Sequence, residues 1–362
     1  MLKIAKACHI IITNILGGEN KMLGFFLAIK NFVYTLLSIV VALPLAATMC
    51  LPGDPDTPVM INAEAENAYI NEYLGPDVSA HRSGAGVVPQ NTLMAFQTVL
   101  EQSDTLGVDT FEFDVQLTKD GELIILHNLT YDETSNAVEQ YGHKSVYASS
   151  LTYEEAYNNL NLGENFTADG ETYPYRGLRG EDIPDNLRVA KCEDVIDYIE
   201  ANSNGKKYRY IIEIKSMSID GMKAADKLYE VITERDLADR VIWASSNEDV
   251  SIYMEHKYPD MPRSARTTEA LRFYIYARMN WDLDDLGVSY VALQIPYGSS
   301  AAGGLINTGT RELINYAHKY DIAVQYWTIN DEEAAKTLIE NGADCIMTDY
   351  PEMVFETVKS CK

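Results

Sequence analysis

From residue 78 onward, short apolar runs alternate with longer segments whose apolar residues recur every three or four positions. The short runs predict strands, and the longer segments predict amphipathic helices. The expected strands cover residues 78–81, 111–115, 122–127, 208–215, 241–245, 262–265, 290–293, 323–327 and 344–347. The expected helices cover residues 91–102, 152–160, 191–201, 222–234, 247–257, 268–278, 310–320 and 332–341.

Two of these strands lie too close together in the chain for a parallel connection. Only six residues separate the second strand from the third, and a parallel crossover needs about a dozen. Because Asp120 and Gly121 favour a tight turn, we expect an antiparallel hairpin that returns His127 to the neighbourhood of residues 112–114. When the hairpin arm at 122–127 is set aside, eight strands remain, and helices fit between most of them. This pattern predicts an α/β fold, a closed (β/α)8 TIM barrel, with an open doubly wound sheet as the alternative.

Residues 1–50 do not follow this pattern. They carry four lysines and one glutamate, and the 19 residues from position 32 to position 50 have no charge. This arrangement predicts a signal peptide or a single membrane anchor, which would make the rest of the chain extracellular or membrane-anchored. Cys50 is a candidate for lipidation, although Met49 before it fits a lipid-attachment signal poorly.

The rest of the chain is expected to form two parts. Residues 51–76 are polar, with proline and glycine at both ends, and are predicted to be a linker that contains a short helix over 63–73. The barrel is predicted over residues 77–358. Within it, residues 128–190 are rich in Asn, Tyr, Thr and Gly and are predicted to be an insertion. Thr152 and Glu155 fit a capping box at the start of its helix.

The composition limits the partners of this chain. Hydrophobic residues make up 46% of it, enough for a sizeable core, and the formal net charge is −25. After residue 50 the chain has 25 basic and 53 acidic residues. Such a body repels nucleic acid and anionic membranes, so no nucleic-acid partner is expected and membrane contact is expected only through the N-terminal segment. The five cysteines show no zinc spacing and imply no disulfide framework.

The strand at 111–115 carries the first sign of chemistry. Its residues alternate, so Glu112 and Asp114 share one face while three apolar side chains share the other. Two carboxylates this close repel unless a cation or a shared proton relieves them. A hard divalent cation suits such oxygens. An isolated pair of this kind is more typical of a solvated strand face. Glu213 and Lys215 share a face of another strand in the same way.

The carboxyl ends of barrel strands meet at one mouth, where active sites of this fold lie. Carboxylates there favour a divalent cation, arginine and lysine suit a phosphate, and two histidines can divide the work of acid and base. Gln294 fits either a ligand contact or a satisfied core amide, and Trp327 fits either the pocket wall or the core. The residues expected at this mouth are His81, Arg82, Glu112, Asp114, His127, Glu213, Lys215, Gln294, Trp327, Thr348 and Asp349.

From about residue 80 to residue 351 the sequence also resembles the glycerophosphodiester phosphodiesterase family. Each matching piece is weak alone, but their order and spacing together are specific. The pieces are His81-Arg82, Pro89-Gln90-Asn91-Thr92, Phe111-Glu112-Phe113-Asp114-Val115, Leu117-Thr118-Lys119-Asp120-Gly121, His127, Ile183-Pro184, Glu213-Ile214-Lys215, Trp327-Thr328-Ile329-Asn330 and Thr348-Asp349-Tyr350-Pro351. Three positions depart from the family pattern: Ser83 replaces a glycine, Gln90 a glutamate and Asn128 an aspartate. The last two remove charge, which bears on metal affinity and pH optimum.

The resemblance implies a divalent metal, Ca²⁺ or Mg²⁺, held by Glu112, Asp114 and Glu213. It implies that Arg82 and Lys215 bind the phosphodiester together with this metal. His81 and His127 would be the acid–base pair, in an order that the sequence leaves open. The implied reaction is hydrolysis of a small-molecule glycerophosphodiester to glycerol 3-phosphate and an alcohol, with water or the glycerol hydroxyl as the nucleophile.

Three other functions remain as alternatives. A lipid phosphodiesterase that acts like a phospholipase D needs an apolar rim facing the membrane, which the polar insertion does not obviously supply. A glycoside hydrolase could use the carboxylates, but it leaves two histidines and a lysine without a role. A non-catalytic binding module on the same barrel is favoured only if His81 or His127 lies away from the mouth. The sequence does not indicate the oligomeric state.

Overall fold

The computed structural model of the protein describes residues 53–54, 56–60, 64–71, 75–298, 301 and 306–361. The expected signal peptide or anchor at residues 1–50 lies outside these residues. Within them, no helix is both long and apolar enough to cross a membrane. The strands are β1 (Asp77–Ala80), β2 (Thr110–Leu117), β3 (Leu123–Ile125), β4 (Arg209–Ile214), β5 (Val241–Ala244), β6 (Ala292–Pro296), β7 (Ala323–Trp327) and β8 (Cys345–Thr348).

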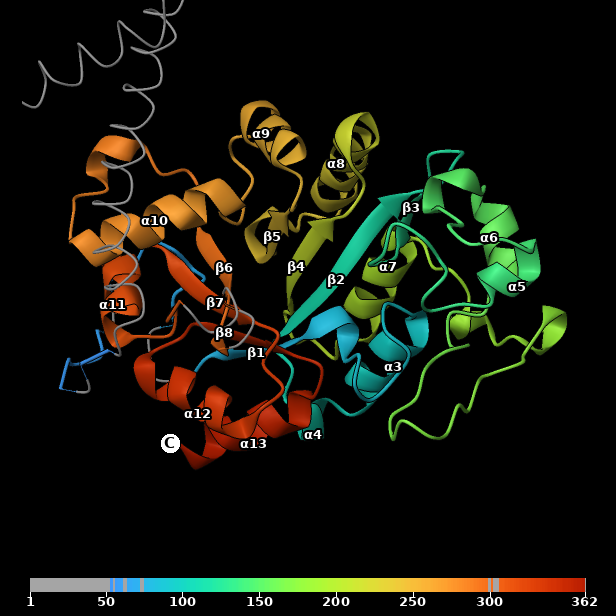
Figure 1. Ribbon diagram of the computed structural model, residues 1–362, viewed down its shortest axis with the longest axis horizontal. Helices are drawn as coiled ribbons and strands as arrows, with labels where there is room; N and C mark the ends of the chain where they lie inside the picture. The colour runs from blue at the N-terminus through green and yellow to red at the C-terminus, as the bar shows by residue number, and fades with distance from the viewer. Residues whose placement is uncertain are drawn as a thin grey trace, which may run out of the picture. The chain divides into compact units, whose positions relative to one another are not determined.

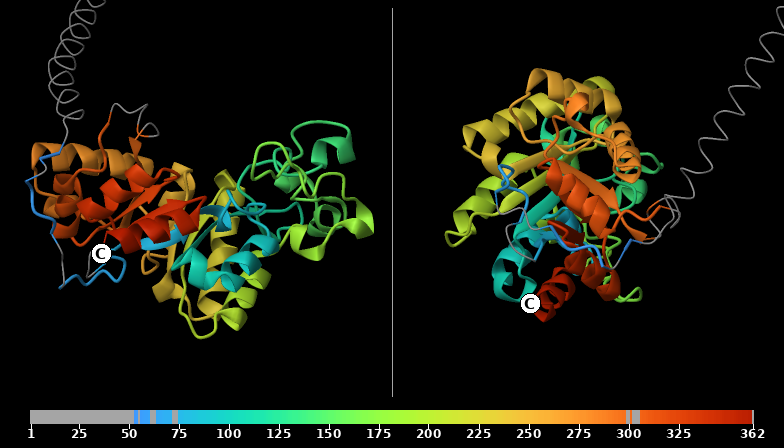
Figure 2. Two further views of the ribbon diagram at one scale, coloured as in Figure 1. Left: turned by 90° about the horizontal axis from the view of Figure 1, so that it is seen from below. Right: turned by 90° about the vertical axis from the view of Figure 1, so that its left-hand side faces the viewer.

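Helices lie outside the strands in every view (Figures 1 and 2). The α-helices are α3 (Leu93–Glu101), α4 (Ser103–Leu106), α5 (Ala137–Tyr141), α6 (Tyr153–Asn159), α7 (Cys192–Asn202), α8 (Ser218–Glu234), α9 (Glu248–Lys257), α10 (Thr267–Met279), α11 (Arg311–Lys319), α12 (Glu332–Asn341) and α13 (Pro351–Ser360). The short 3-10 helices are η1 (His81–Ser83), η2 (Ala148–Ser150), η3 (Gly180–Asp182), η4 (Asp185–Leu187), η5 (Ala238–Arg240) and η6 (Asp284–Leu286).

The parallel strands form a closed barrel. Their order is β5-β4-β2-β1-β8-β7-β6. Arg263 and Ser264 fill the gap between β5 and β6, because Trp243 pairs with Arg263 and Ser264 pairs with Ala292, both in parallel. These two residues complete the eighth position of the ring. The predicted (β/α)8 barrel is therefore confirmed, and the open doubly wound sheet was the wrong alternative.

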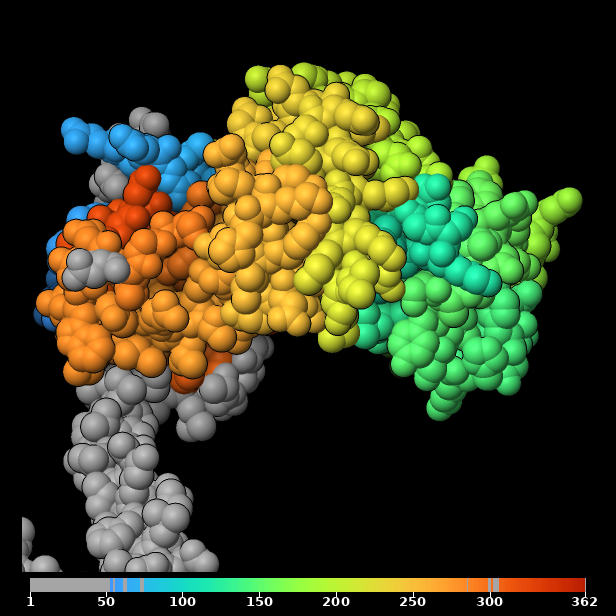
Figure 3. Space-filling model, turned by 90° about the horizontal axis from the view of Figure 1, so that it is seen from above, coloured from blue at the N-terminus to red at the C-terminus, as the bar shows by residue number. Residues whose placement is uncertain are grey.

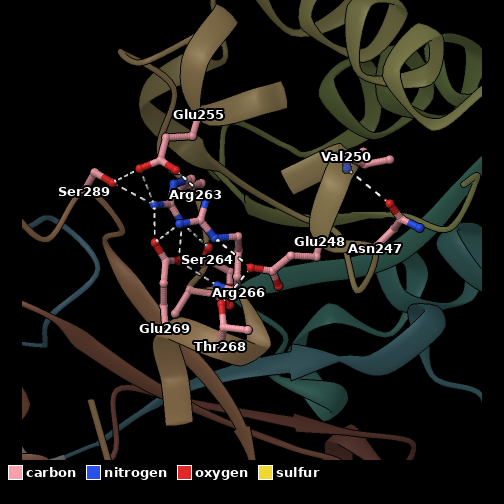
Figure 4. A network of polar contacts seen from close by, with 11 residues as sticks. Asn247, Glu248, Val250, Glu255, Arg263, Ser264, Arg266, Thr268, Glu269 and Ser289 are labelled. Atoms are coloured by element: carbon pink, nitrogen blue, oxygen red, sulfur yellow. Dashed lines mark hydrogen bonds and ion pairs between the residues drawn. The ribbon is translucent and has the colours of Figure 1, made fainter. Parts of the chain in front are cut away.

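The expected strand at 262–265 is present only as these two bridges. Arg263 is 2% exposed and sits in a network of ion pairs that covers the seam (Figure 4). Its guanidinium donates to both carboxylate oxygens of Glu269 at 2.7 and 2.9 Å and to Glu255 at 2.9 Å. Arg266 donates to the same two glutamates. Side-chain charge pairs thus support the shortest part of the barrel wall.

The predicted hairpin is confirmed. β3 pairs with β2 in antiparallel fashion, with Val115 opposite Ile125 and Leu117 opposite Leu123. Gly121 closes the turn with φ at 80°, a left-handed conformation that glycine adopts without strain. The inserted segment follows, and buried apolar residues between positions 124 and 189 form a separate core cluster there. The capping box of Thr152 and Glu155 at the start of α6 is present as expected. Figure 3 shows this segment, in green, beside the helices of the barrel.

Residues 67–71 close the end of the barrel where the strands begin. Tyr69 and Ile70 are buried in one cluster with residues at or near the start of several strands, including Ile242, Ala292 and Ala323. The side-chain amide of Asn67 donates to the carbonyls of Val291 at 2.7 Å and Asp321 at 2.9 Å. This segment is part of the packing of the barrel.

Some boundaries differ from the sequence prediction. The short helix expected over 63–73 is not formed in the described residues 64–71, where turns carry the chain instead. The strand expected at 290–293 runs from Ala292 to Pro296, because polar Gln294 belongs to an alternating strand rather than to its end. Helix α8 begins at Ser218, four residues earlier than expected, and helices α4, α5 and α13 were not predicted.

Candidate active site

The turn after β1 places His81 and Arg82 at the mouth of the barrel. Both belong to η1, and Arg82 and Ser83 have φ values of 47° and 62°. This left-handed turn aims the backbone N–H of Arg82 at Glu112, and the Oε2 atom of Glu112 accepts it at 2.7 Å. Non-glycine residues rarely adopt such a conformation, so the surrounding contacts hold it in place.

The three predicted carboxylates come from adjacent strands. Glu112 and Asp114 lie on β2, and Asp114 pairs in register with Glu213 of β4. Glu112 is 5% and Asp114 1% exposed. The Lys215 ammonium lies 3.3 Å from Asp114 Oδ1 and 2.8 Å from Glu213 Oε2. The side-chain amide of Asn91 donates to Asp114 Oδ2 at 2.9 Å. Asp114 and Glu213 thus share one cation of the chain.

Glu112 and Asp114 differ in their charge balance. Burial and the negative charge of Asp114 raise the pKa of Glu112 to about 7. Burial also acts to raise the pKa of Asp114, but Lys215, His127 and Arg82 outweigh it and hold this pKa below its usual range. Among the described residues, Glu112 forms no ion pair within 4.0 Å. The site therefore has an excess of negative charge at Glu112.

The two histidines have different surroundings. His81 Nδ1 lies 2.7 Å from Asp349 Oδ1. Burial acts to lower the pKa of His81, but the hydrogen bond to Asp349 and the charge of Glu112 outweigh it, so this pKa is raised. Arg82 Nη2 donates to His127 Nε2 at 2.8 Å, and His127 Nδ1 donates to Asn128 at 2.5 Å. Burial, together with Lys215 and Arg82, lowers the pKa of His127.

A cavity of about 270 Å³ opens at this mouth. All nine residues proposed from the sequence for catalysis, substrate or metal line it; their individual roles stay predictions. Trp327 is 41% exposed at the end of β7, so it forms pocket wall rather than core. Gln294 both lines the cavity and donates to Gln325 Oε1 at 2.9 Å. The lining consists of His81, Arg82, Glu112, Asp114, His127, Ile211, Glu213, Lys215, Ser246, Gln294, Trp327, Thr328 and Met347.

Several supporting residues had no assigned role in the sequence prediction. Asp349 orients His81, Asn91 bonds Asp114, and Gln90 Oε1 accepts from Arg82 Nη1 at 2.7 Å. Each lies in a motif that the sequence had already singled out, yet its partner is distant in sequence. Gln90 also shows that an amide oxygen accepts the hydrogen bond from Arg82 at a position where a glutamate is usual.

The residue types fit a hard divalent cation, because three carboxylates supply oxygen ligands and Glu112 forms no ion pair within 4.0 Å among the described residues. Their side chains are not arranged as a ligand shell. Within the part of the chain that the structure describes, no group of three or more His, Cys, Asp or Glu residues is placed to hold a metal ion. Lys215 supplies the positive charge between Asp114 and Glu213.

Comparisons with known proteins agree with this fold. Residues 81–353 match the model of the glycerophosphoryl diester phosphodiesterase family. A glycerophosphodiester phosphodiesterase of Caldanaerobacter subterraneus is 29% identical over 290 residues, which cover 78% of this chain and 97% of that protein. One of Bacillus subtilis is 24% identical over 294 residues, covering 79% and 88%.

Solved structures give the same result. An Oleispira antarctica phosphodiesterase in complex with its product sn-glycerol-3-phosphate superposes with a TM-score of 0.57 at 19% identity, covering 79% of this chain and 97% of that one. A glycerophosphodiester phosphodiesterase of Agrobacterium tumefaciens gives 0.56 at 16% identity, covering 77% and 98%. The barrel and its mouth define a phosphoric diester hydrolase of the TIM-barrel class. The chain belongs to the glycerophosphoryl diester phosphodiesterase family, whose members hydrolyse glycerophosphodiesters.

Proposed function

We propose that this enzyme hydrolyses glycerophosphodiesters to glycerol 3-phosphate and an alcohol by metal-dependent catalysis with two histidines. The observation that carries the proposal is the single cavity that two histidines, an arginine, a lysine and three carboxylates line together. The product complex of the Oleispira antarctica relative supports glycerol 3-phosphate as a product. A glycoside hydrolase leaves the histidines and Lys215 without work, and neither histidine lies away from the mouth.

Arg82 and Lys215 are the groups that bind the phosphate. Arg82 Nε is buried without a hydrogen-bond partner among the described residues, so it is available to a phosphate oxygen. An arriving phosphate also competes for Arg82 Nη2, which now donates to His127. Substrate binding thereby frees the lone pair of His127 Nε2. Lys215 and Arg82 then stabilise the charge that grows on the phosphoryl oxygens.

The hydrogen bonds divide the two proton transfers between the histidines. Asp349 supports a protonated His81, which donates a proton to the oxygen of the leaving alcohol. His127 is neutral, because its Nδ1 donates to Asn128 and its Nε2 accepts, so it takes the proton of the attacking hydroxyl. Two groups whose pKa values are moved in opposite directions are suited to these opposite tasks.

Glu112, Asp114 and Glu213 would hold the metal, Ca²⁺ or Mg²⁺. When bound, it polarises the phosphoryl group and offsets the negative charge of the site. Without a cation, Glu112 takes up a proton near neutral pH, because burial and Asp114 raise its pKa to about 7. We expect a chelator to abolish turnover and added Ca²⁺ or Mg²⁺ to restore it. Full activity in the chelated, metal-free protein would refute the metal requirement.

The activity is tested by release of glycerol 3-phosphate from glycerophosphocholine. His81→Ala and His127→Ala are each expected to lower kcat by about 10²–10⁴-fold, the usual contribution of acid–base catalysis. His143→Ala, an exposed histidine of the insertion, is the matched control and should keep full activity. If either site variant keeps near-wild-type turnover, the assignment of that histidine is wrong.

A second candidate substrate is a lysophospholipid that retains its acyl chain. Exposed apolar side chains after two barrel strands support it: Met217 and Ile219 follow β4, Tyr350 follows β8, and they are 52%, 68% and 42% exposed. Met217→Ser combined with Ile219→Ser should lower cleavage of lysophosphatidylcholine and spare glycerophosphocholine. A variant that changes the two activities by the same factor relative to wild type, or changes neither, would exclude the lipid candidate.

We also propose that residues 1–50 export the enzyme, either as a cleaved signal or as a retained anchor. The uncharged run from position 32 to position 50 supports this location. The test is fractionation of cells that express the full chain. Enzyme in the cytoplasmic fraction alone would contradict the proposal.

A further inference from the structure

A second cavity lies between the loop that follows β1 and the inserted segment. It encloses about 170 Å³. The lining residues are Ala85, Pro89, Gln90, Glu133, Thr134, Leu162, Asn165 and Phe166. The first three belong to the loop that begins directly after η1, and the other five belong to the segment between β3 and α7. A ligand in this cavity would therefore contact the barrel and the insertion together.

Hydrogen bonds connect this cavity with the active site at two points. Gln90 in its wall accepts from Arg82 Nη1 at 2.7 Å. Glu133 in its wall accepts from the side-chain amide of Asn128, whose oxygen accepts from His127 Nδ1 at 2.5 Å. The wall of the cavity is thus one hydrogen bond from the proposed phosphate ligand Arg82 and two from His127.

Two cavities next to one phosphate-binding group match the two halves of a diester. The active-site cavity extends from Arg82 to Ser246, Gln294 and Trp327, which offer hydroxyl, amide and indole groups to one half of the substrate. Gln90 in the wall of the second cavity is hydrogen-bonded to Arg82, and the two cavities share no lining residue. The alcohol on the far side of the phosphorus atom can occupy it.

The lining of the second cavity favours a cation. Among the described residues that line this cavity, Glu133 is the one with a charged side chain, and none is a lysine, arginine or histidine. Its carboxylate is exposed and forms no ion pair with another described residue. Phe166 offers a ring whose face attracts an ammonium group. Thr134 Oγ1 is buried and has no hydrogen-bond partner among the described residues, so it can pair with a polar ligand atom.

We propose that this second cavity is a leaving-group subsite selective for an alcohol that carries an alkylammonium group, as choline and ethanolamine do. Glu133 supplies the counter-charge and Phe166 the aromatic face, while the phosphate stays on Arg82. This inference rests on the proposed function and adds the class of alcohol to it. The strongly negative protein also raises the local concentration of cationic substrates.

The test compares two substrates that differ in the charge of the alcohol. Glu133→Gln should lower kcat/KM for glycerophosphocholine by about tenfold. It should change kcat/KM for glycerophosphoglycerol, whose leaving alcohol has no charge, by less than about twofold. Glu171→Gln, an exposed glutamate of the same insertion that does not line the cavity, is the matched control and should change neither value. An equal loss on both substrates would mean that Glu133 acts through Asn128 and His127, and would overturn the subsite.

Choline itself is the second probe. It should bind wild-type enzyme in calorimetry and inhibit hydrolysis competitively, and Glu133→Gln or Phe166→Leu should weaken both effects by about tenfold. Binding that is absent, or unchanged in both variants, overturns the subsite. Wild-type enzyme that cleaves no glycerophosphodiester overturns the proposed function instead, and choline binding by calorimetry still decides the subsite in that case.

Discussion

The proton on His81 depends on a residue 268 positions away in the chain. Asp349 holds the imidazole through Nδ1 and is itself held by Asn330, whose side-chain amide donates to Asp349 Oδ2 at 2.6 Å. Burial acts to raise the pKa of Asp349, but the hydrogen bond and charge of His81 outweigh it and lower this pKa. The pair therefore favours a charged carboxylate beside a charged imidazole.

Asp349→Asn should make His81 lose its proton at lower pH. The pKa of His81 is raised in the wild type, so activity that needs the protonated imidazole falls as pH rises through that raised value. Removing the carboxylate lowers the pKa, so the alkaline limb of the kcat/KM profile should move to lower pH, and kcat at pH 8 should fall by about tenfold or more. The exposed Asp104→Asn variant is the control. An alkaline limb that stays in place would show that His81 is not the proton donor.

Ser83 is a costly residue at its position. The family usually has glycine here, and Ser83 has φ at 62° with a buried hydroxyl that lacks a partner among the described residues. A left-handed conformation costs a non-glycine residue about 1–2 kcal/mol. Ser83→Gly should therefore raise the free energy of unfolding by about 1 kcal/mol, measured by denaturant titration.

A control variant separates two effects on the stability at Ser83, that of the left-handed backbone and that of the buried hydroxyl. Ser79 also has a buried hydroxyl without a partner among the described residues, but it lies in the extended strand β1. Ser79→Gly should lower stability, and Ser83→Ala should gain less than Ser83→Gly. A Ser83→Gly variant less stable than wild type would show that the side chain of Ser83 stabilises this turn.

At this scale the sequence identifies which residue types gather at the mouth but not their pairing. The nine candidate residues line one cavity because strand ends of a barrel always meet there. The contacts of Asp349 with His81 and of Asn91 with Asp114 need the order of strands around the ring, which local patterns do not contain. The second cavity was equally invisible, because its wall combines a barrel loop with the insertion.

Asp344 joins several elements before β8. Its carboxylate accepts the backbone N–H of Val324 in β7 at 2.7 Å and lies 2.9 Å from Nε2 of His318 in α11. His318 Nδ1 lies 3.1 Å from the carbonyl of Met60. The Asp344 carboxylate and the Met60 carbonyl are both acceptors, so a protonated imidazole donates to both. Burial acts to lower the pKa of His318, but Asp344 outweighs it and the pKa is raised.

This contact should make stability depend on pH. Because the folded pKa of His318 exceeds the unfolded value of about 6.5, its contribution is fully present below that value and is lost as pH rises through the folded pKa. His318→Gln should cost about 1.5–3 kcal/mol at pH 6, the range for a hydrogen bond to a charged group, and less at pH 9. Denaturant titrations at both pH values check this. A cost that does not change with pH would contradict a charged His318.

Periodicity located the elements well where one face is plainly apolar. The hairpin of β2 and β3 followed from a turn signal and a short connection. Prediction failed where side chains rather than spacing decide the structure. Gln294 interrupts an apolar run but continues β6, and Arg263 holds the barrel seam with only two bridges because ion pairs support it.

At the scale of the whole molecule, the barrel is closed in two places, between two of its strands and at its base. The ring closes laterally at Arg263 and Ser264. Tyr69 and Ile70 close its base, at 6% and 5% exposure, although both precede the first strand. Their segment is polar and has proline and glycine at both ends, a composition that predicts a linker. Only the assembled ring reveals the apolar surface that they cover.

Tyr69→Ala and Ile70→Ala should each lower the free energy of unfolding by about 2–5 kcal/mol, the usual cost of truncating a large buried side chain to alanine. Met60→Ala, at an exposed methionine of the same region, should cost less than about 0.5 kcal/mol. Chemical denaturation monitored by tryptophan fluorescence measures all three. If Tyr69→Ala and Ile70→Ala are as stable as the wild type, burial of these two side chains does not stabilise the barrel.

Because Tyr69 and Ile70 close the base of the barrel, they also determine where the folding unit starts. Homology alone suggests trimming the polypeptide near residue 81, where the family match begins. A polypeptide cut at β1 would leave Ile242 and its neighbours open to water from below. Exposed apolar patches of this kind promote aggregation. Expression work on shortened versions should therefore retain at least residue 67, even though that stretch carries none of the catalytic machinery.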